Sequence, residues 1–374
     1  MKIGIDGRAA KWYRGTGIGT YTYQLIKSLS SIDDINDYLI FMPKGLKTEL
    51  SLAHNFTFAD ISAGCSFNFW DEVNIPNILS DKGIDIYHVP QNGVGLSLEK
   101  ACPSIITLHD VIPYRLPETV SKRYIKIFSE NIPSIVEACE GIITVSNFSK
   151  QDIMKAFNYT EDKIQVTYLA AESIYKPMDK TFSKAFLKRK YALENKYILY
   201  VGGFSPRKNI SGLIRAYSIF ADKYNVKLVI AGTRGKSYED YLELVQNLKI
   251  TDKVVFPGFI PTQDLPFFYS GAEVFVYPSF YEGFGLPPVE AMACGTPVIS
   301  SNVTSMPEII GDAGILVDPK DVIELSKAIE GVLLDKDLWQ RLSKHGIKRA
   351  AYFSWKKNAM ETLSFYNRIM SDIY

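Results

Sequence analysis

The sequence predicts an α/β protein made of two doubly wound domains, each with a parallel sheet covered by helices on both faces. Short apolar, β-branched runs alternate with longer segments of helical period along the chain. The pattern restarts near residue 197, after a polar and helical stretch at residues 176–196. A length of 374 residues also exceeds the roughly 100–200 residues of one typical domain. We therefore expect a domain boundary close to residues 172–180.

The individual elements follow from the same alternation in both halves of the chain. In the first half, strands are predicted at residues 3–5, 38–42, 84–89, 104–108 and 142–145. Helices are predicted at residues 21–29, after a glycine loop, and from residue 147 or 149 onward. In the second half, strands are predicted in YILYVGG, VKLVIAG, KVVFPGF, EVFVYPS and TPVISS, and helices at about residues 209–224 and at residues 287–293.

Composition excludes several classes of protein. Lys and Arg number 42 against 41 Asp and Glu, which argues against a nucleic-acid binder because such proteins need a basic excess. The four cysteines form no CxxC pair, so neither a zinc site nor a disulfide framework is predicted. No apolar run reaches the roughly 18–20 residues of a transmembrane helix, and the N-terminus does not resemble a secretory signal. These features predict a cytoplasmic protein, with peripheral contact at the inner membrane face left open.

Where two doubly wound sheets face each other, ligands bind in a cleft lined by the loops that follow the strands. The first such loop, RGTGIGT, holds Gly17 directly before a helix. Its glycines let backbone N–H groups approach a phosphate, although a tight turn needs glycine equally. No ribose-binding acid follows the second strand and no GKS or GKT follows the glycines. Neither an NAD site nor a Walker A loop is therefore favoured.

Two further loops carry polar side chains at predicted strand ends. His109 and Asp110 directly follow the strand at residues 104–108, a position that favours function over a structural hydrogen bond. Arg207 and Lys208 lie between the glycines of GGFSPRKN and a helix start. Two cations beside a helix N-terminus suit a diphosphate, and the glycine turn makes a plain solvated pair the weaker interpretation.

The strongest signal is the segment at residues 278–297, where a strand ends in a glycine loop and prolines open a helix. Glu282 lies in the loop, and we expect Glu290 in the first turn of the helix. Carboxylates accept hydrogen bonds from sugar hydroxyls, so one could hold a hexose and the other a ribose. Complementing the helix dipole could explain Glu290 but not Glu282, which lies in an apolar, glycine-rich loop.

These four motifs, in this order, resemble those of the family 4 glycosyltransferases, which are retaining enzymes of the GT-B fold. Glu282 and Glu290 match the E-x7-E motif of the family, GGFSPRKN its diphosphate loop, and TLHDVIPY and TVSNFSK its N-terminal domain. The resemblance covers nearly the whole chain. It implies an acceptor-binding domain of residues 1–175 with 355–374, to which the last helix returns. Residues 176–354 would form the nucleotide-sugar-binding domain.

The resemblance also implies roles for individual residues. Glu290 would bind the nucleotide ribose. Among the catalytic residues, Glu282 would hold the donor-sugar hydroxyls, His109 would contact the donor sugar, and Arg207 and Lys208 would hold the diphosphate. Further donor contacts are implied near the diphosphate, along the backbone that faces the base and between the two glutamates, at Gly17, Gly203, Phe259, Ile260, Gly283, Phe284, Gly285 and Leu286. Many relatives have an arginine in place of Gly203 and paired glycines in place of Thr16-Gly17, so Arg207 and Lys208 would carry more of the phosphate charge.

Departure of a nucleoside diphosphate requires charge neutralisation, which two cations and two helix ends can supply without a metal. We expect no metal and no cofactor, with the nucleotide-sugar as co-substrate. PRKN and GLPPVEAMACGTPV look most like the mannosyltransferase branch, which implies GDP-mannose as donor and a glycan or lipid-linked glycan as acceptor in polysaccharide biosynthesis. UDP-glucose, another nucleotide-sugar, a sucrose- or glycogen-type synthase and a binding protein without transfer activity are the alternatives.

Two segments bear on the acceptor and the membrane. Phe67, Phe69 and Trp70 are candidates for acceptor selection, although a core or interface role is favoured for them. The stretch at residues 122–128 mixes basic and apolar residues, so it fits either contact with anionic lipid or a solvated helix.

Overall fold

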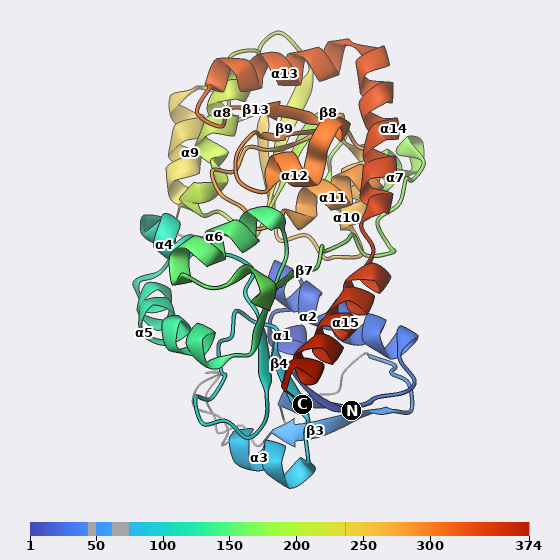
Figure 1. Cartoon of the computed structure of the whole chain (residues 1–374). Helices are drawn as coiled ribbons and strands as arrows, with labels where there is room; N and C mark the ends of the chain where they lie inside the picture. The colour runs from blue at the N-terminus through green and yellow to red at the C-terminus, as the bar shows by residue number, and fades with distance from the viewer. Residues whose placement is uncertain (44–49, 62–74, 236, 374) are drawn as a thin grey trace. The chain divides into compact units, whose positions relative to one another are not determined.

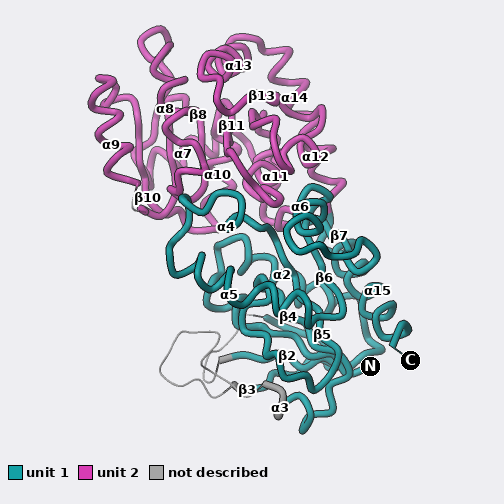
Figure 2. The backbone as a smooth tube through the Cα atoms, turned by 60° about the vertical axis from the view of Figure 1, so that its left-hand side comes forward, with its two compact units in different colours: residues 1–169, 354–374 teal, residues 170–353 magenta. Residues whose placement is uncertain are grey.

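The computed structural model describes residues 1–43, 50–61, 75–235 and 237–373. The chain forms two compact units, residues 1–169 with 354–374 and residues 170–353 (Figure 2). The first boundary thus follows residue 169, where the sequence predicts residue 175. The aromatic candidates Phe67, Phe69 and Trp70 lie outside the described residues.

The first unit contains a parallel sheet with the strand order β3-β2-β1-β4-β5-β6-β7. Strands β3, β4 and β7 of this sheet are labelled in Figure 1. Its strands are β1 (Lys2–Asp6), β2 (Asp37–Pro43), β3 (Phe56–Ile61), β4 (Ile86–Val89), β5 (Ser104–Thr107), β6 (Gly141–Thr144) and β7 (Ile164–Val166). Its helices are α1 (Arg8–Trp12), α2 (Gly17–Ile32), α3 (Ile75–Lys82), α4 (Ile112–Arg115), α5 (Lys122–Ala138), α6 (Asn147–Phe157) and α15 (Trp355–Ile373). Strands β4, β5 and β6 are buried along their whole length, which explains why they appear in the sequence as continuous apolar runs.

The second unit contains a parallel sheet with the order β10-β9-β8-β11-β12-β13. Its strands are β8 (Lys196–Val201), β9 (Val226–Ala231), β10 (Val254–Gly258), β11 (Val274–Tyr277), β12 (Val298–Ser301) and β13 (Ile315–Val317). Its helices are α7 (Lys180–Tyr191), α8 (Ile210–Ser218), α9 (Tyr238–Asn247), α10 (Leu265–Gly271), α11 (Leu286–Ala293), α12 (Met306–Ile310), α13 (Val322–Leu334) and α14 (Lys336–Tyr352). The prediction of two doubly wound parallel sheets is confirmed.

The ends of two predicted helices differ from the structure. Helix α2 begins at Gly17, four residues before the predicted start, because the side chain of Thr16 caps it by accepting from Gly19 N at 3.2 Å. Helix α8 ends at Ser218, so the predicted helix at residues 209–224 is too long. Among the described helices, none is both long and apolar enough to cross a membrane.

The last helix of the chain completes the first unit. Helix α15 packs against α2, which lies more than 300 positions earlier in the sequence (Figure 1). The buried Asn358 of α15 donates from Nδ2 to the carbonyl oxygens of Thr167 and Tyr168, at 3.3 and 3.0 Å. These carbonyls lie just before the chain enters the second unit, so Asn358 ties together the two points where the backbone crosses between units.

Replacing Asn358 by alanine should therefore destabilise the first unit by about 1–3 kcal/mol, because a buried and a partly buried carbonyl group lose their side-chain donor. Urea titration of the wild type and the variant measures this difference in the free energy of unfolding. Asn367→Ala, a change at an exposed asparagine of the same helix, is the matched control. Equal unfolding curves for the two variants would contradict the role of Asn358.

Candidate active site

The strand order points to a candidate binding site in the second unit. The order reverses between β8 and β11, and in doubly wound sheets ligands bind at the carboxyl ends of such a pair. The loop after β8 leads through a short 3-10 turn, Pro206–Lys208, into α8. The loop after β11 leads into α11. Glu282, Arg207 and Lys208 all lie on these two loops, as the sequence predicts.

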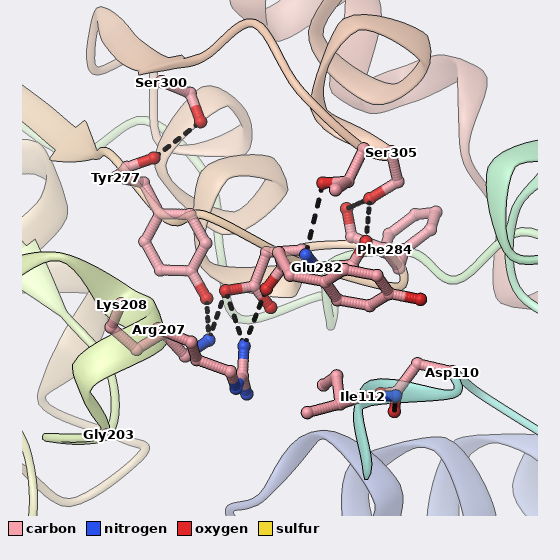
Figure 3. A network of polar contacts seen from close by, with 12 residues as sticks. Asp110, Ile112, Gly203, Arg207, Lys208, Tyr277, Glu282, Phe284, Ser300 and Ser305 are labelled. Atoms are coloured by element: carbon pink, nitrogen blue, oxygen red, sulfur yellow. Dashed lines mark hydrogen bonds and ion pairs between the residues drawn. The ribbon is translucent and has the colours of Figure 1, made fainter. Parts of the chain in front are cut away.

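These three charged side chains form one buried cluster. Lys208 Nζ lies 2.6 Å and Arg207 Nη1 3.1 Å from Glu282 Oε1, and the glutamate is only 6% exposed. Figure 3 shows both cations pointing at the carboxylate, with Tyr277 beside Lys208. The cluster contains two positive charges and one negative charge, so it carries a net positive charge.

The surroundings of Glu282 keep its carboxylate ionised. Burial by itself would raise the pKa of Glu282, but the charges of Lys208 and Arg207 outweigh burial and lower the pKa to about 2. A carboxylate with so low a pKa is a poor proton acceptor. It remains a good hydrogen-bond acceptor, so the arrangement suits binding of hydroxyl groups better than general-base catalysis.

Hydrogen bonds on both sides hold the backbone at Glu282. Ser305 Oγ donates to Glu282 O at 2.9 Å, and Thr304 Oγ1 accepts from Glu282 N at 3.2 Å. Arg207 Nη1 also donates to Tyr281 O at 2.9 Å. The carboxylate therefore has a fixed position before any ligand binds, which is the arrangement that a preorganised site requires.

Two residues next to this cluster, Tyr277 and Asn209, have no role in the sequence-based predictions. Tyr277, the last residue of β11, accepts from Lys208 Nζ through its hydroxyl at 2.5 Å. Asn209 caps α8 in a left-handed conformation and donates from Nδ2 to Pro278 O, after β11, and to Pro319 O, after β13, so it joins the β8 loop to both of these segments. Asn209 stands in the PRKN motif, but neither partner carbonyl can be found from the sequence.

Glu290 lies further along α11 than the sequence predicts. Helix α11 starts at Leu286, so Glu290 falls beyond its first turn, and the prediction of a first-turn position is wrong. Tyr269 donates to Glu290 Oε2 at 2.8 Å. Complementing the helix dipole is therefore not the role of Glu290, because that effect is confined to the first turn.

The glycines of these loops differ in how much space a side chain would have at their positions. A side chain at Gly285 would need the left-handed φ of 96° and would meet Met306 Cε at 2.5 Å. A side chain at Gly202 would meet the hydroxyl of Tyr200 at 2.6 Å, whereas a Cβ at Gly203 would meet nothing within 4 Å. A larger residue at position 202 would therefore displace the side chain of Tyr200, whereas position 203 has room for a larger residue.

The other predicted donor contacts in the second unit lie on loops at the carboxyl ends of strands, except Leu286, which is the first residue of α11. Phe259 and Ile260 follow β10, and the ring of Phe259 is 61% exposed while Ile260 is buried. Gly283 and Phe284 continue the Glu282 loop, and the buried Phe284 accepts from Ser305 Oγ through its carbonyl at 3.3 Å. No group of three or more His, Cys, Asp or Glu side chains suited to a metal ion occurs among the described residues.

His109 and Gly17 belong to the first unit. Gly17 is the first residue of α2, so its N–H lies in the helical turn whose amides lack partners within the helix. His109 Nε2 lies 3.0 Å from Pro90 O, and its backbone N donates to Asn92 Oδ1 at 2.8 Å. Burial lowers the pKa of His109 to about 4, so the imidazole is neutral near pH 7.

The reversal of strand order in the first sheet, between β1 and β4, holds a second buried ion pair. Asp6, which ends β1, lies 2.5 Å from Arg8 Nη2 and accepts from Gln91 Nε2 at 2.6 Å. All three side chains are buried. The sequence analysis assigned no role to these residues, since no motif marks Gln91, whose contact with Asp6 joins positions 85 apart.

Comparison with known proteins identifies the family. The family model described as Glycosyltransferase Family 4 matches residues 15–171, and that described as Glycosyl transferases group 1 matches residues 183–349. O-antigen chain mannosyltransferase B from Escherichia coli is 33% identical over 371 residues, which cover 95% of this chain and 96% of that protein. The chain belongs to glycosyltransferase family 4.

Solved structures agree with the GT-B fold of this glycosyltransferase. Sucrose-phosphate synthase from Thermosynechococcus elongatus superimposes with a TM-score of 0.80 at 22% identity, covering 100% of both chains. HepE from Anabaena, in complex with UDP and glucose, superimposes with a TM-score of 0.74 at 18% identity, covering 98% of this chain and 100% of that chain.

The low pKa of Glu282 predicts a pH-dependent stability of this glycosyltransferase. Because the pKa in the folded state lies below the ordinary 4.5, the ionised group stabilises the fold above pH 4.5, and this contribution disappears as the pH falls to about 2. The shift corresponds to about 3 kcal/mol. Urea titration of the wild type and Glu282→Gln should show a gap in stability at pH 6 that narrows markedly at pH 3.

Glu194→Gln is the control for that experiment, because Glu194 forms an ion pair with Lys188 in which both side chains are about 60% exposed. Exposed pairs contribute little, so this variant should match the wild type at both pH values. A gap between the wild type and Glu282→Gln that stays constant with pH would contradict the ionised state of Glu282.

Proposed function

We propose that this glycosyltransferase transfers mannose from GDP-mannose to a hydroxyl of a glycan or lipid-linked glycan in polysaccharide biosynthesis, with retention and without a metal. The observation that carries the proposal is the buried cluster of Glu282, Arg207 and Lys208 at the β8–β11 reversal. A mannosyltransferase related along nearly the whole chain supports the choice of sugar and the setting.

In the proposed complex, Arg207 and Lys208 bind the diphosphate. A guanidinium has five N–H donors and an ammonium has three, so both can bond Glu282 and still donate to phosphate oxygens. Charge-assisted hydrogen bonds contribute about 1.5–3 kcal/mol each, and they strengthen as the leaving diphosphate gains charge. The residues thus provide the neutralisation that a metal ion would otherwise provide.

Glu282 binds the donor-sugar hydroxyls, and Glu290 binds the ribose. Because Glu282 is paired with two cations and is a weak base, we propose that it acts neither as nucleophile nor as general base. The bond between the anomeric carbon and the phosphate oxygen then breaks with its electron pair going to the diphosphate. The acceptor hydroxyl attacks the same face of the sugar, and its proton passes to the departing phosphate. This sequence retains the configuration without a covalent enzyme intermediate.

The two remaining donor contacts and the membrane belong to the same proposal. His109 contacts the donor sugar, and the amides at Gly17 approach the diphosphate.

The apolar side of α5 is turned inward, since Phe128 and Ile132 are buried, while Lys122, Arg123 and Lys126 are exposed. We propose that these three cations provide any peripheral contact with anionic lipid.

Titration calorimetry without metal should give a clear preference for GDP over UDP and ADP. A radiolabelled transfer assay with GDP-mannose and a lipid-linked glycan should then give product whose yield is unchanged by EDTA. Preference for UDP would replace the donor by a UDP-sugar. Tight nucleotide binding with neither transfer nor donor hydrolysis would indicate a binding protein instead.

Substitution of the two glutamates should separate their roles. Glu282→Gln should reduce transfer by at least about 100-fold with little loss of GDP affinity, because hydroxyl binding by the carboxylate is lost while both cations remain. Glu290→Gln should instead weaken GDP binding by about tenfold, since one charge-assisted bond to the ribose becomes neutral.

Glu273→Gln provides the matched control. Glu273 is a largely buried glutamate of the same unit that also pairs with two lysines, Lys180 and Lys184. This variant should lose stability without losing transfer per folded molecule. Transfer by Glu282→Gln within a few fold of the wild type would refute the proposed role of Glu282.

A further inference from the structure

A chain of four buried side chains runs through the first unit from its last helix to α2. The hydroxyl oxygen of Tyr366, in α15, lies 2.6 Å from His88 Nδ1. His88 Nε2 lies 2.8 Å from Thr107 Oγ1, which in turn lies 2.9 Å from the hydroxyl of Tyr21. All four side chains are fully buried.

The four side chains of this hydrogen-bonded series satisfy one another's hydrogen-bonding groups. Burial, with a smaller effect of the nearby His109, lowers the pKa of His88 to about 3, so the ring is neutral. A neutral imidazole has one donor and one acceptor nitrogen, and the hydroxyls on either side can each donate or accept. The hydrogen bonds can therefore all form at once, which holds the rotamer of each side chain, including that of Tyr21.

The hydrogen-bonded series ends at Tyr21, whose ring contacts the ring of His109. The ring centroids of Tyr21 and His109 lie 4.9 Å apart with an interplanar angle of 88°, an edge-to-face contact. The imidazole also has a hydrogen bond between Nε2 and Pro90 O. That bond fixes one ring atom, and the perpendicular ring of Tyr21 adds a constraint on the tilt of the ring plane.

We propose that Tyr21 is a positioning residue, which holds the imidazole of His109 at the tilt needed for transfer and is itself held through Thr107, His88 and Tyr366. This inference rests on the proposed function, in which His109 contacts the donor sugar. It links the last helix of the chain to the reaction, since Tyr366 belongs to α15.

The test compares Tyr21→Leu, His109→Ala and the double variant by steady-state transfer kinetics. Small displacements of contact groups can reduce rates by one to two orders of magnitude. Tyr21→Leu should therefore lower kcat about tenfold or more, leave GDP affinity unchanged, and have no further effect once His109 is alanine. Tyr21→Phe, which keeps the ring and loses only the hydroxyl bond, should fall between the wild type and Tyr21→Leu.

Tyr38→Leu is the matched control, because Tyr38 is another buried tyrosine of the same unit. Its hydroxyl donates to Asp33 Oδ2 at 2.6 Å and its ring stacks on Phe56. This variant should lose stability without losing kcat. An equal loss of kcat in both leucine variants, or an additive loss in the double variant, would overturn the positioning role.

A measurement that needs no activity separates this inference from the proposed function. The chain has four histidines, so NMR of labelled imidazoles resolves His109, assigned with His109→Ala. In Tyr21→Leu the His109 signal should broaden or split as the ring samples more than one tilt. A single sharp signal with an unchanged Nε2–H would overturn the inference. Absence of transfer in the wild type, or full activity of His109→Ala, would instead refute the proposed function or the role of His109 within it.

Discussion

A carboxylate buried in an apolar loop must be compensated, and the site in the second unit depends on how Glu282 meets that requirement. Its partners, Arg207 and Lys208, lie on the loop after a different strand, β8, so the ion pairs join the β8 and β11 loops. Losing both partners would leave an unpaired buried carboxylate, which is far more costly than losing the partner of an exposed one. The same contacts hold two cations beside the start of α8. One interaction therefore joins the two loops and gathers positive charge at the candidate site.

The two sheets use their topology in parallel ways. Each has a reversal of strand order, β1–β4 in one unit and β8–β11 in the other, and each reversal holds a buried carboxylate paired with a cation. In the first unit Gln91 donates a further hydrogen bond to Asp6, whereas in the second unit the hydroxyl of Tyr277 accepts one from Lys208. Charged groups gather at these points because the loops after the two strands turn to opposite faces of the sheet and leave the strand ends uncovered.

Burial has opposite outcomes for the two most important titratable groups. His109 has a carbonyl oxygen as its ring partner, so desolvation prevails and the imidazole is neutral near pH 7. Glu282 has two cations, which outweigh desolvation, so the carboxylate is ionised. A neutral imidazole and an ionised carboxylate can both accept hydrogen bonds from hydroxyl groups, which is consistent with sites that recognise a sugar.

The amino-acid pattern alone determined the two parallel sheets, most of the strands and the loops that carry Glu282, Arg207, Lys208 and His109. These follow from local signals, namely apolar runs, glycine turns and charged residues at strand ends. The pattern misplaced two helix starts: the side chain of Thr16 caps α2 four residues before the predicted start, and α11 begins too early for Glu290 to lie in its first turn. Only the tertiary structure paired Glu282 with two cations, joined Asn209 to the segments after β11 and β13, and connected Tyr366 to Tyr21 through His88 and Thr107. Such contacts join residues up to 278 positions apart, and no local propensity encodes them because they exist only once the sheets have assembled.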